Sequence, residues 1–217
     1  MNRTGLLCRA AGVAAAVVCS TFSAYALPIT GEVWLNDFSD NAGACTVCVG
    51  SPSSTFNPGA INYDSNVTGY TVGQFVNDPL GLSFSNPGVA ANNLDNTHIR
   101  ITGTIGLLAG NNSFVVGHDD GVVMSITGIG LVVNDPGPTS FSNTPFNVVA
   151  PSTGNYDFVL DYNECCGGPA ALLLSINDVV VTSETPLPAG LPLFVSGLGT
   201  LGLLGWRRKK KAAALTA

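Results

Sequence analysis

Basic residues are nearly missing from the middle of this chain. All fourteen acidic residues lie between Glu32 and Glu184, and the only Lys or Arg in that interval is Arg100. Nucleic acids and anionic lipid surfaces are normally bound by clusters of Lys and Arg. We therefore expect no nucleic-acid partner for this part of the protein. Its acidic surface should instead attract divalent cations.

Histidines and catalytic motifs are also scarce. The two histidines, His98 and His118, lie in no nucleophile-elbow or zinc-protease motif. Asp161 and Glu164 could act as a pair of glycosidase carboxylates, but spacing in sequence does not show that they face each other. His118 lies beside Asp119 and could be a ligand or a base, although a histidine at a hairpin end is typically a surface residue. These observations predict a protein that is not an enzyme.

Helical periodicity is absent from the region between the two ends. Short runs rich in β-branched and aromatic residues alternate there with turn segments rich in Gly, Pro, Asn and Asp. The pattern predicts an all-β fold, an antiparallel, jelly-roll-like β-sandwich over residues 27–184. Alternate residues from Tyr156 to Tyr162 are expected to face the core. The expected strands are 31–36, 69–76, 97–107, 112–118, 122–127, 129–133, 146–149, 156–162, 170–176 and 179–182.

Four cysteines lie within this region, namely Cys45, Cys48, Cys165 and Cys166. The segment 40–66 around the first pair is poor in apolar residues and is predicted to be a long loop tied down by its cysteines. An even number of cysteines favours structural disulfides in an oxidising compartment. Bridges between the two pairs are slightly favoured, because a bridge between adjacent cysteines requires a strained geometry.

Two other roles for the cysteines are less favoured but open. A four-thiolate zinc site needs well-spaced cysteine pairs, and adjacent cysteines do not easily both point at one metal. A redox-active Cys-x-x-Cys usually begins a helix in a βαβ unit, and no such unit is predicted here.

Both ends of the chain differ from the middle. Residues 1–26 carry Arg3 and Arg9, an apolar run and small residues before a predicted cleavage site after Ala26, which is typical of a signal peptide. Residues 189–206 are uncharged and long enough to span a membrane. The basic residues after this predicted helix should stay on the cytoplasmic side. They are Arg207, Arg208, Lys209, Lys210 and Lys211.

The C-terminal 185–217 segment resembles the PEP-CTERM sorting signal in its Val-Pro-Leu-Pro-Ala variant. Thr185 stands where that variant usually has Val, and the Pro-Glu-Pro of the main type is missing. The resemblance implies export through signal peptidase, transient anchoring in the inner membrane of a Gram-negative bacterium, and processing by an exosortase. It also implies a final location at the cell surface or in the extracellular matrix. The sorting motif consists of Pro186, Leu187, Pro188 and Ala189.

Asp119, Asp120 and Gly121 separate two apolar, β-branched runs. Asp-Gly is a favoured pair for a two-residue hairpin, because both positions then need positive φ, so a hairpin is predicted here. Two neighbouring carboxylates also provide the hard oxygen ligands that Ca²⁺ prefers. A calcium shell needs six to eight oxygens, so a second loop would have to contribute.

The region 97–176 resembles the protective-antigen-type β-sandwich domain, which also occurs in yeast flocculins, fungal adhesins and some glycosidases. The resemblance rests on the order of Asp119-Asp120-Gly121 and the later Tyr162-x-Glu164-x-x-Gly-Gly motif. In lectin members of that family, the two aspartates are joined by a cis peptide and hold a calcium ion that contacts sugar hydroxyls. For Glu164, packing over the glycines is an equally supported alternative. The implied calcium ligands are Asp119, Asp120, Asn163 and Glu164, and the implied ligand-binding residues are His118, Asp119, Asp120 and Gly121.

These features predict an exported, non-catalytic surface or matrix protein. In the first hypothesis, its sandwich binds extracellular polysaccharide with the help of Ca²⁺, for adhesion or association with exopolysaccharide. In the second hypothesis, the same fold is purely structural and has no specific ligand.

Overall fold

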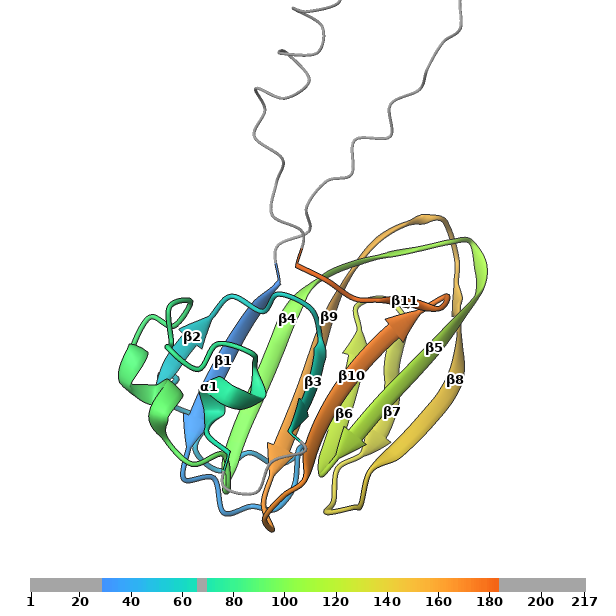
Figure 1. Ribbon diagram of the computed structural model, residues 1–217. Helices are drawn as coiled ribbons and strands as arrows, with labels where there is room; N and C mark the ends of the chain where they lie inside the picture. The colour runs from blue at the N-terminus through green and yellow to red at the C-terminus, as the bar shows by residue number, and fades with distance from the viewer. Residues whose placement is uncertain (1–28, 66–69, 184–217) are drawn as a thin grey trace, which may run out of the picture.

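The computed structural model describes residues 29–65 and 70–183 (Figure 1). The predicted signal peptide, sorting motif, membrane segment and basic cluster lie outside these residues. No helix within the described ranges is long and apolar enough to cross a membrane.

The described chain is built almost entirely of antiparallel strands (Figure 1). The strands are β1 (Thr30–Leu35), β2 (Ser54–Phe56), β3 (Asn62–Ser65), β4 (Thr97–Leu107), β5 (Gly110–Asp119), β6 (Gly121–Ile126), β7 (Gly130–Asp135), β8 (Ser142–Ala150), β9 (Gly154–Glu164), β10 (Ala170–Ile176) and β11 (Val179–Val180). The short helices are α1 (Val72–Phe75) and the 3₁₀ helix η1 (Pro87–Ala91).

Two sheets pack face to face. One contains six strands in the order β2-β1-β4-β9-β6-β7. The other contains five, in the order β11-β10-β5-β8 with β3 also paired to β10. Strand β8 is at an edge, which explains how it accommodates Pro145, a residue without an N–H for the ladder. The antiparallel β-sandwich predicted from the sequence is confirmed.

The core lies between the sheets because each strand alternates in hydrophobicity. Ile99 and Leu160 are fully buried on the inner face of the six-stranded sheet, and Phe114 and Leu172 on that of the five-stranded sheet. Phe158, Leu160 and Tyr162 are buried as predicted, while Tyr156 is half-buried at the margin. Residues between them on β9 point to the opposite face.

Two predicted segments differ from the structure. Residues 69–76 were expected to be a strand, but they contain α1, whose N-terminus is held by reciprocal hydrogen bonds between Thr71 and Gln74. This capping box provides hydrogen-bond partners for the backbone N–H groups of Thr71 and Gln74. In a strand, those groups would need partners on a neighbouring strand. The predicted loop 40–66 contains β2 and β3, and Phe56, Ile61 and Tyr63 within this segment are buried. Its few apolar residues are enough to hold two edge strands.

Candidate functional site

The Asp119-Asp120-Gly121 segment is not a hairpin turn, contrary to the sequence prediction. Strand β5 pairs with β8 and β10 in one sheet, whereas β6 pairs with β7 and β9 in the other. The segment therefore carries the chain from one sheet to the other. The peptide bond between Asp119 and Asp120 is cis, as the family resemblance implied.

Gly121 is required by crowding at this junction. A Cβ at this position would lie 2.1 Å from the carbonyl oxygen of Pro136, a distance that real Cβ atoms do not show. The glycine therefore allows the loop after β7 to approach the start of β6. That approach brings the loop 136–141 next to the two aspartates.

The two aspartates are nearly buried, with 7% and 6% of Asp119 and Asp120 exposed. One carboxylate oxygen of Asp120 accepts a hydrogen bond from the backbone N–H of Thr139 at 3.0 Å. The other oxygen accepts from the N–H groups of Cys165 and Cys166 at 3.1 and 3.4 Å. Asp120 thus joins the β7–β8 loop to the β9–β10 loop.

Asp119 has fewer compensating contacts. Burial raises its pKa, the neighbouring charge of Asp120 raises it further, and a hydrogen bond from the backbone of Phe141 acts in the opposite direction. Two adjacent, nearly buried carboxylates repel each other unless a cation compensates them. The only Lys or Arg in the described ranges is Arg100, which is bonded to Asp161.

A pocket of about 380 Å³ opens over this pair. Its lining residues are Asp119, Asp120, Pro138, Thr139, Ser140, Gly167, Gly168 and Pro169. A second pocket of about 320 Å³ shares Asp119 and is mainly apolar, with Phe141, Pro169 and Leu173 in its wall. Phe141 is 49% exposed, so its ring is available at the surface.

Glu164 lies beneath the pair rather than in the pocket. It is fully buried, and its two carboxyl oxygens lie within hydrogen-bonding distance of the hydroxyls of Tyr70 and Tyr162. The Tyr162 hydroxyl also contacts the carbonyl oxygen of Asp119. Burial raises the pKa of Glu164 to about 8, although the two tyrosine hydrogen bonds act to lower it. Glu164 therefore supports the aspartate junction through Tyr162.

Asn163 points away from the aspartates. Successive side chains on a strand alternate between faces, so Asn163 and Glu164 lie on opposite sides of β9. The Asn163 amide lies 3.4 Å from a carboxylate oxygen of Asp37, on the outer face of the six-stranded sheet. The structure thus brings Asp119, Asp120 and Glu164 together and places the Asn163 side chain elsewhere.

His118 is fully buried, which contradicts its predicted place at the surface. Because β5 enters a sheet-to-sheet junction and not a hairpin, its last residues are covered from both sides. The His118 Nδ1 atom donates to the carbonyl oxygen of Asp120 at 2.7 Å, since a carbonyl can only accept. His118 therefore orients the junction, and its Nε2 lies 3.6 Å from Asp135.

Each disulfide joins cysteines that are close in sequence. The sequence had slightly favoured bridges between the two pairs, and that prediction is wrong. Cys45 is bonded to Cys48, and Cys165 to Cys166. The first pair lies beside His98 on the outer face of the six-stranded sheet, while the second lies beside Asp120 at the junction. The two pairs occupy different sites, so a bridge between them has no opportunity to form.

Sequence reasoning missed Thr139, Ser140 and Phe141. The Asn-Asp-Pro-Gly-Pro segment before them indicated a loop, but no local pattern says which distant residues a loop will approach. The signal that could have pointed there is Gly121, whose lack of a side chain permits the close contact with Pro136.

Comparison with known proteins identifies the fold. No family model and no curated protein sequence matches the chain. Among solved structures, a PA14 sugar-binding domain from an RTX adhesin is 20% identical, with a TM-score of 0.51, over 71% of this chain and 93% of that domain. The PA14 domain of the MpAFP antifreeze protein is 19% identical, with a TM-score of 0.55, over 73% of this chain and 88% of that domain. At this identity the likeness shows a shared β-sandwich fold.

Proposed function

We propose that this protein is an exported, non-catalytic surface or matrix protein whose β-sandwich binds carbohydrate with the help of Ca²⁺. The observation that carries the proposal is the pair of nearly buried carboxylates, Asp119 and Asp120, at the base of a polar pocket without a basic residue. The similarity to a domain described as sugar-binding, from an adhesin, supports the same ligand class.

The residues around the pair suit a calcium ion. Calcium binds six to eight oxygens, and the pocket is lined by two carboxylate residues, Asp119 and Asp120, and by the oxygen-bearing residues Thr139, Ser140, Gly167 and Gly168. A bound divalent cation would offset the repulsion between the two carboxylates. It would also provide a positive centre for sugar hydroxyls. Asp119 and Asp120 are the proposed protein ligands, and Glu164 the residue that holds their backbone in place.

The neighbouring apolar pocket complements this site. A sugar ring has polar hydroxyls at its edge and apolar C–H groups on its faces, and ligand sites typically combine apolar walls with a few placed polar groups. Phe141 lies in the apolar wall, and Asp119 is shared by both pockets. A ring held by its hydroxyls at the aspartates could therefore rest its C–H face against Phe141.

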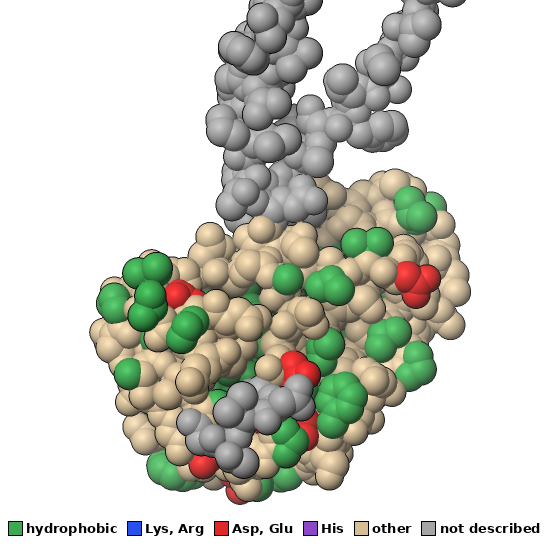
Figure 2. Space-filling model, viewed as in Figure 1, with side chains coloured by type: hydrophobic (Ala, Val, Ile, Leu, Met, Phe, Trp, Pro, Cys, Tyr) green, Lys and Arg blue, Asp and Glu red, His purple; other side chains and the backbone are tan. Residues whose placement is uncertain are grey.

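The surface charge favours neutral sugars or a cation-bridged acidic polysaccharide. On the face drawn in Figure 2, acidic side chains are visible among the described residues and no Lys or Arg. Export, inner-membrane anchoring and removal of the tail by an exosortase complete the proposal. They rest on the Pro186–Ala189 motif, the uncharged 189–206 span and the basic cluster 207–211 in the sequence.

Calcium titration by calorimetry, followed by glycan-array binding with and without chelator, tests the proposal. We expect saturable calcium binding and glycan binding that chelator abolishes. Asp120→Asn should weaken calcium binding at least ~100-fold, since even partners outside the metal shell commonly cost ~10–100-fold. Asp157→Asn, the same change at an exposed site on β9, is the matched control and should leave both signals unchanged.

The purely structural hypothesis predicts a different outcome. If calcium changes neither the melting temperature nor the glycan signal, the binding proposal is wrong and a matrix role without specific ligand is favoured. Phe141→Ala separates the two pockets, because it should lower glycan affinity while calcium affinity stays the same.

A further inference from the structure

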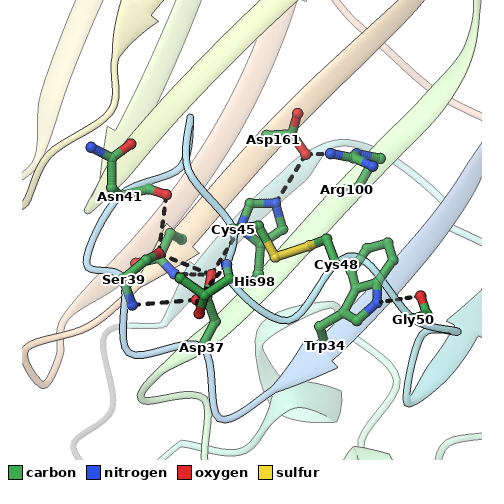
Figure 3. The surroundings of a disulfide bond; sticks show 12 residues. Trp34, Asp37, Ser39, Asn41, Cys45, Cys48, Gly50, His98, Arg100 and Asp161 are labelled. Carbon is green, nitrogen blue, oxygen red and sulfur yellow. Dashed lines mark hydrogen bonds and ion pairs between the residues drawn. A yellow bond between two sulfur atoms is a disulfide. The ribbon is translucent and has the colours of Figure 1, made fainter.

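A second cluster of cysteine and histidine side chains, residue types that bind metals, lies on the outer face of the six-stranded sheet, away from the aspartate pocket. It contains the Cys45–Cys48 disulfide and His98, as Figure 3 shows. The sulfurs of both cysteines and a ring nitrogen of His98 all lie within 4.8 Å of one another. Both cysteines are half-buried, so a reductant can reach them.

His98 is held as a metal ligand would be. It is fully buried, and its Nε2 lies 2.9 Å from Asp161, whose carboxylate also accepts from Arg100. A carboxylate can only accept, so Nε2 carries the hydrogen and Nδ1 is the nitrogen left for another partner. Histidines that bind metals almost always donate their other ring N–H to such a group.

The Nδ1 atom of His98 is buried and has no hydrogen-bond partner. It faces a carboxylate oxygen of Asp37 at 3.4 Å. Nδ1 therefore has a carboxylate nearby but makes no hydrogen bond to it.

We propose that Cys45, Cys48 and His98 form a zinc site when the disulfide between the cysteines is open. The spacing Cys-x-x-Cys and a Cα separation of 5.5 Å suit two sulfur ligands of one ion. Water would complete the fourth position. The disulfide and the zinc site are alternative states of the same loop, and neither involves Cys165 or Cys166.

The exchange between the disulfide and the zinc site conserves both electrons and protons. A dithiol reductant gives two electrons and two protons to the Cys45–Cys48 bond, which becomes two thiols while the reductant becomes a disulfide. Zinc then displaces both thiol protons, because only thiolates bind it. In vitro, a phosphine can reduce the disulfide instead. The phosphine then becomes a phosphine oxide, and water supplies its oxygen and the two thiol protons.

The full chain, with its disulfides intact or reduced by a phosphine, is titrated with zinc in excess calcium, which occupies the aspartate pocket. We expect one zinc per reduced chain and none per oxidised chain. Cobalt(II) in place of zinc should give the intense visible absorption of a tetrahedral thiolate site. Trp34, whose ring centroid is 6.1 Å from that of His98, should report binding by fluorescence.

Variants locate the ligands. Cys48→Ser, on the half-buried loop, should weaken zinc binding at least ~100-fold, and Asp161→Asn should weaken it by ~10–100-fold, as partners behind a ligand do. His98→Gln should also lose zinc, and near-ultraviolet circular dichroism checks that it is folded. The double variant Cys165→Ser, Cys166→Ser is the control and should bind zinc normally.

Several outcomes overturn the proposal. They are no zinc uptake after reduction, equal uptake by the oxidised chain, uptake that survives Cys48→Ser, and loss of uptake in the Cys165→Ser, Cys166→Ser control. None of them bears on the calcium and glycan experiments, which use the oxidised protein.

Discussion

Tyr162 has one hydroxyl hydrogen but two oxygen neighbours, the carbonyl of Asp119 and the carboxyl group of Glu164. A carbonyl can only accept, so the tyrosine hydrogen goes to Asp119 when Glu164 supplies a hydrogen of its own. A protonated Glu164 therefore satisfies all three groups, in agreement with a pKa raised to about 8 by burial. At neutral pH this residue is a buried neutral acid.

Protonation of Glu164 predicts a pH dependence of stability. Its pKa is about 8 in the folded protein and near 4.5 when unfolded, so the folded state binds more protons between these values. The free energy of unfolding should therefore fall as pH rises from about 4.5 to about 8, by at most about 1.4 kcal/mol per pH unit from this group. Urea unfolding of the wild type and Glu164→Gln across this range measures the difference. In Glu164→Gln, the free energy of unfolding should fall less steeply with pH than in the wild type. The control Glu32→Gln on β1 should keep the wild-type pH dependence. Equal pH dependence in all three proteins would contradict a buried neutral acid.

The Tyr162 hydroxyl also carries a stability prediction. Tyr162→Phe should lower the free energy of unfolding by about 1–3 kcal/mol, because it removes the buried hydroxyl that contacts the Asp119 carbonyl and one carboxyl oxygen of Glu164. Tyr156→Phe is the control, since its hydroxyl bonds to Ser152 at an exposed site, and should cost less than about 1 kcal/mol. If both variants lose the same amount, the buried network adds nothing specific.

At the scale of elements, the junction between β5 and β6 depends on Gly121. Gly121→Ala should destabilise the protein by about 1–3 kcal/mol, because its Cβ would meet the Pro136 carbonyl and force the backbone apart. Gly106→Ala on β4, where the nearest atom to a new Cβ is 4.0 Å away, should change stability by less than about 0.5 kcal/mol. Chemical denaturation compares them, and a neutral Gly121→Ala would mean that the loop yields easily.

The sequence predicted elements where alternation was long and undisturbed. Strands β4 and β10 have the predicted bounds, because both keep a regular buried face. Alternation says nothing about which sheet a strand joins, so Asp119-Asp120-Gly121 was taken for a hairpin. The capping box of α1 was missed because its apolar residues also fit a strand. Short edge strands such as β2 depend on neighbours distant in sequence.

The candidate site was predictable only in part. The order of motifs identified Asp119 and Asp120, and it placed Glu164 close to them. The pocket wall from the β7–β8 loop, including Thr139 and Phe141, depends on a contact between sequence regions that share no pattern. Burial of His118 likewise follows from the crossing between sheets and not from its neighbours in sequence.

For the whole molecule, the excess of acidic residues predicts a response to salt. Like charges on the folded surface repel one another, and monovalent ions screen this repulsion. Sodium chloride with chelator present should raise the free energy of unfolding in urea, by roughly 1 kcal/mol or less on the scale of surface charge interactions. The double variant Glu32→Gln, Asp157→Asn should respond less. A fall in stability with salt would show that local ion pairs such as Arg100–Asp161 outweigh the repulsion.

The position of the junction within the sandwich decides what the pocket can reach. Strand β1 begins, and the described chain ends, at one end of the sandwich, while β5 meets β6 at the other (Figure 1). The six residues of β1 alone separate these ends by about 20 Å. In the surface protein proposed above, the aspartate pocket would therefore lie at the end of the sandwich away from the ends of the described chain. If the proposed anchoring and glycan binding hold, copies side by side on one support would compete less for ligand than if the pocket lay on a flank of the sandwich.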